Sequence, residues 1–224
     1  MFQPIPLEAF ETRTGIRRNE WGAGWGAARE IISLRDMIKI VAVAVMPLDY
    51  LRRLLESVTL QGNPNEKPYR GCALRRVRMD PDNVLVGQTF VERSKYQAFL
   101  EDFQDAFADF CVTKGVAKCT ALIALGERVS GSLAVAHYIP PIVEEHQNHE
   151  RLCLVDGIHR NFLVKMIGTT LETIIVEGVK TPFPCDLHKW NAVQPVAAKP
   201  PLEKRFFNLR PELFRDLKAI GIDG

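Results

Sequence analysis

The pentapeptide "DGIHR", residues 156–160, places an acid, a glycine, a histidine and an arginine between an apolar run and a helical pattern. A strand that ends in Asp-Gly and turns directly into a helix presents the first N–H groups of the helix and the positive end of its dipole, which together favour an anion. Gly157 lets a ligand approach the backbone closely. We therefore expect Gly157, Ile158 and the amides after them to cradle phosphate, with the side chains of His159 and Arg160 on its oxygens.

Two more residues at the turn are candidates for the same site. Asp156 can hold a metal ion or an acceptor hydroxyl, and His159 can also shuttle a proton. Asn161 follows Arg160 directly and is a further candidate for nucleotide binding. A purely structural interpretation stays open, in which Asp156 caps the helix, Arg160 is a solvated cation and His159 lies on the surface. An arginine in a first helical turn opposes the dipole, which argues mildly against that interpretation.

The segment "PPIVEEHQNHERLCLVDGIHRNFLVKMIGTTLETIIVEGV" resembles the ParB/sulfiredoxin superfamily, in which a strand pair leads into a D-G-x-H-R or G-x-R-R turn, a helix, a glycine and another strand. Upstream, "VRMDPDNVLVGQTFVERSKYQAFLEDF" is similar to the opening of that superfamily, a strand and a proline turn followed by a helix. The resemblance covers about residues 70–180. It implies a small mixed sheet with flanking helices.

Departures from the pattern narrow the implied chemistry. Sulfiredoxins place their catalytic cysteine immediately before His-Arg, where this chain has Ile158, and Cys153 falls in the preceding strand and is expected to be buried. Reduction of sulfinic acids is therefore not expected. ParB partition proteins carry a second arginine where this chain has His159, and no pair of DNA-reading helices follows Val179. A role in chromosome segregation is not expected either.

Free-serine kinases of the superfamily share the D-G-x-H-R turn most closely, and DGQHR-type proteins of DNA-modification systems look similar around it. The kinases use the aspartate near the substrate hydroxyl and a separate upstream acid as base. In the corresponding region this chain has Gln88, which can contact a nucleotide but cannot act as a base, and Glu92, a candidate base displaced by four residues. The resemblance thus implies catalytic roles for Asp156, His159 and Glu92.

The ligand implied by these branches is a nucleoside di- or triphosphate, with ATP, ADP and CTP not distinguished, together with Mg²⁺ held by Asp156. The first hypothesis is a Mg-dependent phosphotransferase that acts on a small-molecule acceptor, or a nucleotide hydrolase. The second is a non-catalytic DNA- or nucleotide-binding regulatory module. A nuclease is a third option, although the sequence lacks a dense acidic cluster.

The pattern of elements predicts an α+β fold. Residues 67–184 form the expected ParB/sulfiredoxin-like domain, preceded by a partly helical extension at 1–66 and followed by a tail at 185–224. Inside the domain we expect strands, a hairpin and two helices. These elements are the strand "CALRRVRM", a helix in "SKYQAFLEDFQDAFADFCVTKG", a strand in "KCTALIAL", the hairpin "AHYIPPIVEEHQNHERLCLVDG", a helix over 160–167 with Gly168 as its cap, and the strand "LETIIVEGV".

The segments that flank this domain have fewer defined elements. Residues 33–58 form either one helix stopped by Pro47 or a strand at 39–45 followed by a helix from Pro47, and the second arrangement is favoured. The first ~25 residues look weakly structured because of their glycines. In the tail, a helix from about Pro211 to Gly221 has an apolar face, so we expect it to dock beside the active cleft.

Composition limits the partners and the compartment. The formal net charge is only +2, which favours no polyanion overall, and no apolar run approaches the about 20 residues of a membrane span. The five cysteines form no C-x-x-C pair, which fits a reducing cytoplasm. Two local features are exceptions. The arginines of "YRGCALRRVRM" are a candidate DNA contact. The histidines of "HQNH" are a candidate metal site, although a structural role is favoured for them.

Overall fold

The computed structural model describes residues 8, 9, 12, 31, 32, 36–95, 121–146 and 151–222. In this part the chain is a mixed α+β protein with several sheets and few helices, as predicted at that level. The expected helix after residue 93 is described only up to residue 95, and the first 25 residues and the "HQNH" tip lie largely outside the described residues. No helix of the described part has the length and apolar character to cross a bilayer.

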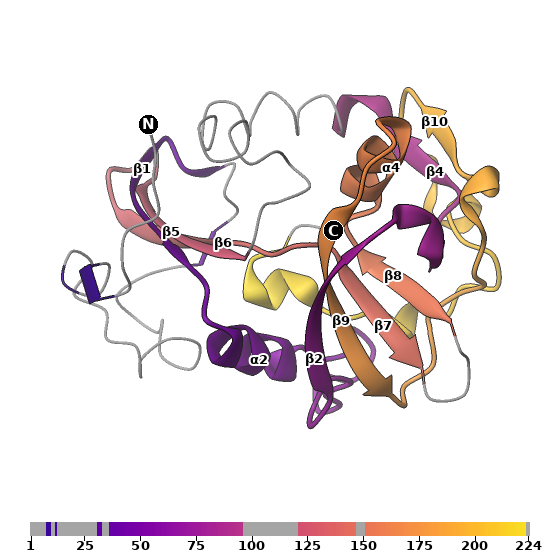
Figure 1. Cartoon of the computed structure of the whole chain (residues 1–224), viewed down its shortest axis with the longest axis horizontal. Helices are drawn as coiled ribbons and strands as arrows, with labels where there is room; N and C mark the ends of the chain where they lie inside the picture. The colour runs from indigo at the N-terminus through magenta and orange to yellow at the C-terminus, as the bar shows by residue number, and fades with distance from the viewer. Residues whose placement is uncertain are drawn as a thin grey trace.

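The larger sheet has five strands in the order β2-β9-β7-β8-β3 (Figure 1). Strand β7 is antiparallel to β8 and parallel to β9, so the antiparallel pair predicted around "HQNH" is confirmed and lies inside the sheet, whereas residues 136–138 of the predicted hairpin belong to a strand of another sheet. Strands β2 and β9 agree with predicted strands as well, whereas β3 was not predicted. Their bounds are β2 (Ala73–Met79), β3 (Val84–Val86), β7 (Ile142–His146), β8 (Leu152–Asp156) and β9 (Leu171–Val179).

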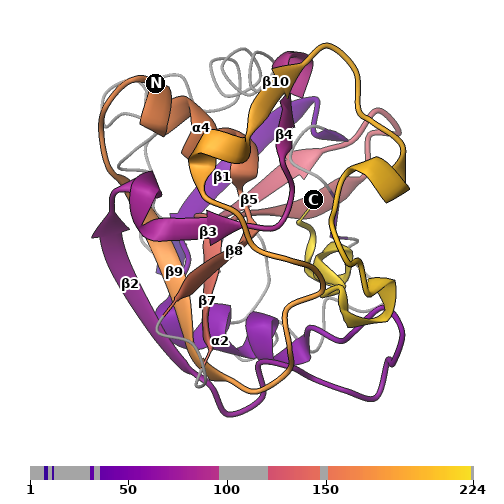
Figure 2. The same ribbon diagram turned by 90° about the vertical axis from the view of Figure 1, so that its right-hand side faces the viewer.

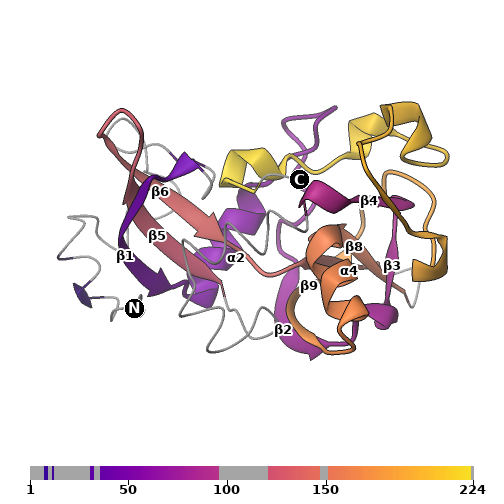
Figure 3. The same ribbon diagram turned by 90° about the horizontal axis from the view of Figure 1, so that it is seen from above.

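A second sheet of three antiparallel strands, β1 (Lys39–Val45), β5 (Leu122–Glu127) and β6 (Leu133–Tyr138), lies beside the first along the long axis of the molecule (Figures 1 and 3). Strand β1 pairs with β5, so this sheet joins chain from before residue 66 to chain well after it. The segment before 66 is therefore built into the fold through its strand.

Helix α2 (Leu48–Ser57) begins directly after Pro47, which confirms the strand-then-helix arrangement over the helix stopped at Pro47. Its buried side chains recur on one face, Tyr50, Leu51, Leu54 and Leu55. This face belongs to a core cluster that also includes side chains of both sheets and of the tail. The two sheets and the helix thus share one hydrophobic core.

Helix α4 (Ile158–Met166) follows β8 with a single residue between them, as predicted, and packs against β4 (Phe90–Glu92) and the 3-10 turn η3 (Pro81–Asn83). Strand β4 pairs in parallel with β10 (Gln194–Val196), a short strand of the tail (Figure 2). The tail therefore reaches the same side of the molecule as the DGIHR turn.

The predicted C-terminal helix is wrong in its type, because the tail forms two separate 3-10 turns, η7 (Pro211–Leu213) and η8 (Leu217–Ile220). Phe214 is extended between them, Arg215 makes a β-bridge with Leu60, and the amide of Asp216 bonds to the carbonyl of Thr59. These tertiary hydrogen bonds replace the helical ones that propensity alone would favour. The expected docking does occur, since Leu217 and Ile220 are buried in the core cluster.

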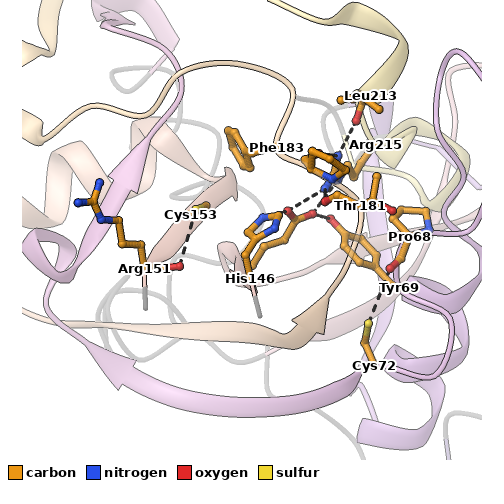
Figure 4. A network of polar contacts seen from close by, with 12 residues as sticks. Pro68, Tyr69, Cys72, His146, Arg151, Cys153, Thr181, Phe183, Leu213 and Arg215 are labelled. Carbon is orange, nitrogen blue, oxygen red and sulfur yellow. Dashed lines mark hydrogen bonds and ion pairs between the residues drawn. The ribbon is translucent and has the colours of Figure 1, made fainter. Parts of the chain in front are cut away.

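A buried charge network, defined by Tyr69, Glu144, His146 and Arg215, fixes the tail to the central strand (Figure 4). Arg215 donates from Nε to Oε1 of Glu144 at 2.7 Å and from Nη2 to Oε2 at 2.9 Å. The hydroxyl of Tyr69 donates to Oε1 and the ring of His146 bonds to Oε2, each at 2.8 Å. Glu144 is completely buried, and every bond it needs is supplied from within the fold.

The electrostatics of this network follow from burial and pairing. Burial alone raises the pKa of Glu144, but the bond to His146 and the charge of Arg215 hold the pKa below its ordinary value. Burial and the neighbouring carboxylate raise the pKa of Tyr69 well above 10.0. The carboxylate is thus ionised and the phenol neutral in the native state.

His137 on β6 is a second buried polar residue that contacts the tail. Its Nδ1 bonds to the carbonyl of Ile220 at 3.0 Å and its Nε2 to the hydroxyl of Tyr50 at 2.8 Å. Burial lowers the pKa of His137 from 6.5 to about 4, although the bond to Ile220 opposes this shift. The folded protein therefore holds this imidazole neutral at physiological pH.

Candidate functional site

The DGIHR turn has the strand-to-helix geometry that the sequence predicts. Asp156 ends β8, Gly157 occupies the left-handed region at φ 93° and ψ 26°, and α4 begins at Ile158. A Cβ at position 157 would lie 2.8 Å from the Cβ of Pro141, so the position excludes a side chain by both its backbone angle and its packing. Glycine is thus required to turn the chain here and start the helix.

Arg160 is bound first of all to its own turn. Its Nη2 donates to Oδ2 of Asp156 and its Nη1 to the carbonyl of Ile139, each at 2.6 Å, and the guanidinium lies 5.4 Å from the ring centre of Tyr138. The side chains of Arg160 and Asp156 are only 12% and 8% exposed. Because they neutralise each other, Arg160 supplies less net charge to a phosphate than the sequence suggests.

His159 joins the helix to the neighbouring strand. Its Nε2 accepts the backbone N–H of Glu92 at 3.2 Å, which requires a lone pair on this nitrogen and so favours the neutral ring with its proton on Nδ1. The carboxylate of Glu92 lies 4.0 Å from Nζ of Lys95. The structure therefore brings together His159 and Glu92, which are 67 positions apart in the chain.

The remaining predicted residues divide into two groups. Gln88 lies near the turn, with its Nε2 donating to the carbonyl of Phe90 at 2.9 Å. Asn161 is 2% exposed and its Nδ2 donates to the carbonyl of Gly157 at 3.0 Å, inside the first turn of α4. The prediction that Asn161 contacts a nucleotide is not met by this geometry, because its amide stabilises the helix start and does not reach the cavity described next.

A cavity of about 1000 Å³ opens in front of the turn. All predicted site residues except Asn161 line it, from two separate segments of the chain, 88–92 and 156–160. They are Gln88, Glu92, Asp156, Gly157, Ile158, His159 and Arg160. A volume of this size matches that of small-molecule and cofactor sites.

The tail also lines this cavity. Three of its cations, Lys199, Arg205 and Lys218, line the cavity with Lys95, and we call Lys199, Arg205 and Lys218 the tail cation group. The pKa of Lys199 is lowered by partial burial and then by the charges of Lys95 and Arg205. These cations therefore lie close enough together to repel one another electrostatically.

The tail cation group was missed in the sequence because its members are spread over 20 positions of an irregular segment. No periodic pattern marks them, and only the fold brings them to one cavity. Apolar side chains of the tail lie on the same wall, among them Phe206 and Phe214, whose rings pack edge to face with centres 5.3 Å apart. Such rings offer a surface for a flat organic group.

The metal-binding potential of the described residues is small. No group of three or more histidine, cysteine or acidic side chains suited to a metal ion occurs among residues 36–95, 121–146 and 151–222. Asp156 and Glu92 are the acids that line the cavity, and Asp156 is paired with Arg160. Mg²⁺ commonly binds through one or two carboxylates and the phosphates of its substrate, so these two acids fit a Mg²⁺ that arrives with a nucleotide.

Arg75 and Arg76 of β2, which with Arg70 and Arg78 suggested a DNA contact, take part in cross-strand ion pairs. Arg75 Nε lies 2.6 Å from Glu177 Oε1, and Arg76 Nη2 lies 2.8 Å from Glu172 Oε1, both on the neighbouring strand β9. Their charges are thus largely balanced on the surface of the sheet. This pairing explains Arg75 and Arg76 without a nucleic acid.

The cysteines near the site are poorly suited to nucleophilic chemistry. Cys153 is 1% exposed and burial raises its pKa to about 12, which confirms that it is a buried residue of the strand. Burial, and then the charge of Asp186, raise the pKa of Cys185 to about 12 as well. Neither thiol ionises near neutral pH, so thiolate catalysis has no support here.

Comparisons with known proteins give no relationship on which a function could rest. The chain matches no protein-family model, and it has no match among curated proteins or solved structures. The resemblance to the ParB/sulfiredoxin superfamily therefore stays a sequence-based prediction, and the functional argument rests on the geometry of the cavity.

Proposed function

We propose that the cavity between the DGIHR turn and the tail binds a phosphate-bearing small molecule, with a nucleoside di- or triphosphate as the first candidate. One observation carries this proposal: the residues predicted independently from the sequence line the same cavity as the tail cation group and Lys95. Helix α4 directs the positive end of its dipole to that cavity. A concave, partly apolar site with convergent cations suits an organic phosphate.

Each side chain then has a defined part in binding. The backbone at Gly157 and Ile158 approaches the phosphate, while Asp156 orients Arg160 and reduces its charge. His159, whose Nε2 accepts the amide of Glu92, can donate its Nδ1–H to a phosphate oxygen. Lys95 and the tail cation group neutralise the charge that a phosphate brings.

If the protein transfers or hydrolyses a phosphoryl group, Glu92 is the candidate base. Its side chain is 13% exposed and lines the cavity beside Lys95. Mg²⁺ would be held by Asp156 or Glu92 together with the ligand phosphates and would supply neutralisation of the transferred group. Phosphoryl transfer needs mainly positioning and charge stabilisation, so this small set of residues suffices in kind.

A non-catalytic nucleotide-binding module is the alternative. It is favoured by the close pairing of Asp156 with Arg160, which leaves Asp156 already bound to a cation and so less available to a metal or an acceptor hydroxyl. In such a module the turn would only position the ligand. The two functions differ in turnover and share the binding site.

Calorimetric titration with ADP, ATP and CTP, with and without Mg²⁺, tests the proposed binding. The informative variant is Asp156→Asn combined with Arg160→Gln, because it removes both charges together and leaves neither one buried alone. We expect the dissociation constant to rise at least about tenfold while the circular dichroism spectrum is kept. Lys204→Gln, an exposed tail cation that does not line the cavity, is the control.

Unchanged nucleotide affinity in the double variant would remove the turn from the site. A product assay with bound ATP then separates the two functions. Glu92→Gln should abolish product formation and keep binding if Glu92 is a base, whereas a wild-type protein that binds without turnover supports the regulatory module.

A further inference from the structure

The cations that line the cavity differ in whether a carboxylate already balances them. Ion pairs join Lys39 to Glu127, Lys95 to Glu92, Arg160 to Asp156 and Arg215 to Glu144. For the tail cation group, no carboxylate of the described residues lies within ion-pair distance. The excess positive charge of the cavity therefore comes from the tail.

Electrostatic contacts connect this group to the turn. Lys199 is affected by the charges of Lys95, Arg205 and Lys218, and by the opposite charge of Glu92. Glu92 in turn donates its backbone N–H to His159 of the turn. Glu92 is thus a neighbour both of the tail cation group, through its charge, and of the DGIHR turn, through its backbone N–H.

We propose that the tail cation group forms a second anion-binding region, so that the ligand of the cavity carries a chain of two or more phosphates that extends from the turn to the tail. This inference rests on the proposed function, which puts a phosphate beside the turn. A single phosphate carries about two negative charges at neutral pH. The three cations of the tail cation group supply more positive charge than one phosphate can balance, which fits a diphosphate or a triphosphate.

The shape of the site favours a small molecule as the carrier of this chain. The cations lie on a cavity of about 1000 Å³ whose wall also includes Phe206, Phe214 and Leu202. Those side chains can cover the organic part of a nucleotide. The same phosphate chemistry also occurs in inorganic polyphosphate, so the experiment must compare the two sources.

The test is a titration of AMP, ADP, ATP and inorganic tripolyphosphate against three forms of the full chain. These are the wild type, the triple variant Lys199→Gln, Arg205→Gln and Lys218→Gln, and the control Lys204→Gln. Lys199 and Lys218 are exposed, so their replacement should leave the fold intact; because Arg205 donates to the carbonyl of Pro200, a second variant changes only Lys199 and Lys218.

In the wild type and in Lys204→Gln we expect ADP and ATP to bind at least about tenfold more tightly than AMP. In the triple variant this advantage should disappear, while the affinity for AMP stays within about twofold because the turn is untouched. The double variant at Lys199 and Lys218 should lose a large part of the same advantage. Tripolyphosphate has no nucleoside. If it binds and its binding depends on the tail cations, inorganic polyphosphate is identified as the ligand.

The remaining outcomes separate this inference from the proposed function. If AMP and ADP bind equally well and the triple variant changes neither, the second region is refuted and the site at the turn stands. If tripolyphosphate binds through the tail cations and no nucleotide binds, the nucleotide proposal fails and the second region stands. Absence of binding by all four compounds overturns both.

Discussion

The tail brings two arginines to the cavity in opposite electrostatic situations. Arg215 is buried and bound to Glu144 by two hydrogen bonds, with three backbone carbonyls taking its other N–H groups. Arg205, ten positions earlier, is partly exposed and has no carboxylate partner among the described residues. The first is satisfied by the fold and fixes the tail to strand β7, whereas the second is, in our proposal, a contact of the ligand.

This difference distinguishes charges that stabilise from charges that bind. A buried ion pair contributes structure only as a complete set, because a single member without its partner is costly. Unbalanced cations at a cavity have the opposite effect on stability, since they repel one another until an anion binds. The buried charge network and the tail cation group should therefore respond to substitution with opposite effects on stability.

The largest expected effect concerns the buried charge network. Arg215→Met leaves the carboxylate of Glu144 buried without a counter-charge and should lower the free energy of unfolding by about 3 to 5 kcal/mol, measured by urea denaturation. Adding Glu144→Gln to this variant should restore part of the loss, because the uncompensated charge is gone. A loss below about 1 kcal/mol in Arg215→Met would show that the network does not fasten the tail.

His137 should make stability depend on pH. Its pKa is about 4 in the folded protein against 6.5 for an ordinary histidine, so the unfolded chain binds the extra proton between these values. Stability is then fully present above pH 6.5 and falls as the pH drops to 4, by roughly 3 kcal/mol from this residue.

Urea denaturation at a series of pH values measures this fall. The variant His137→Gln should show a flatter profile over the same interval, because it has no imidazole to protonate. Identical profiles for the two proteins would mean that burial does not hold this imidazole neutral.

Gly157 should be less tolerant than another glycine of the same helix. Gly157→Ala combines a positive φ with a contact of 2.8 Å to Pro141, and we expect a loss of about 2 to 3 kcal/mol. Gly168 also has a positive φ, of 67°, but nothing lies within 4 Å of an added Cβ, so Gly168→Ala should cost only about 1 kcal/mol. Equal losses in thermal unfolding would remove the packing argument for the turn.

The smallest effect is expected for the tail cation group without ligand. Changing Lys199, Arg205 and Lys218 to glutamine removes mutual repulsion, so the unfolding free energy should stay within about 0.5 kcal/mol of the wild type or rise slightly. Raising the salt concentration should shrink any gain. A clear destabilisation of the triple variant would indicate that these cations hold the fold together, as Arg215 does.

Much of the local structure could be predicted from the sequence. The apolar strands around "VDGIHR" and the proline before α2 are governed by residues close in the chain, so their patterns were sufficient. The same holds for the conformation at Gly157, where a strand must turn at once into a helix.

The tail shows what local patterns cannot predict. Residues 211–221 have a helical apolar pattern, yet Arg215 and Asp216 bond to residues 59, 60 and 144, and these distant bonds split the expected helix. Arg160 is a similar case, because it donates to the carbonyl of Ile139, 21 positions away in the chain. The tail cation group depends wholly on this long-range arrangement.

The most direct test of the central claim is a crystal structure of the protein with ADP. The account predicts phosphate density in the cavity, with one phosphate beside Gly157 and His159 and the other within hydrogen-bond distance of Lys199 or Arg205. Density for ADP on another surface, with the DGIHR turn and the tail cations in contact with water alone, would contradict it.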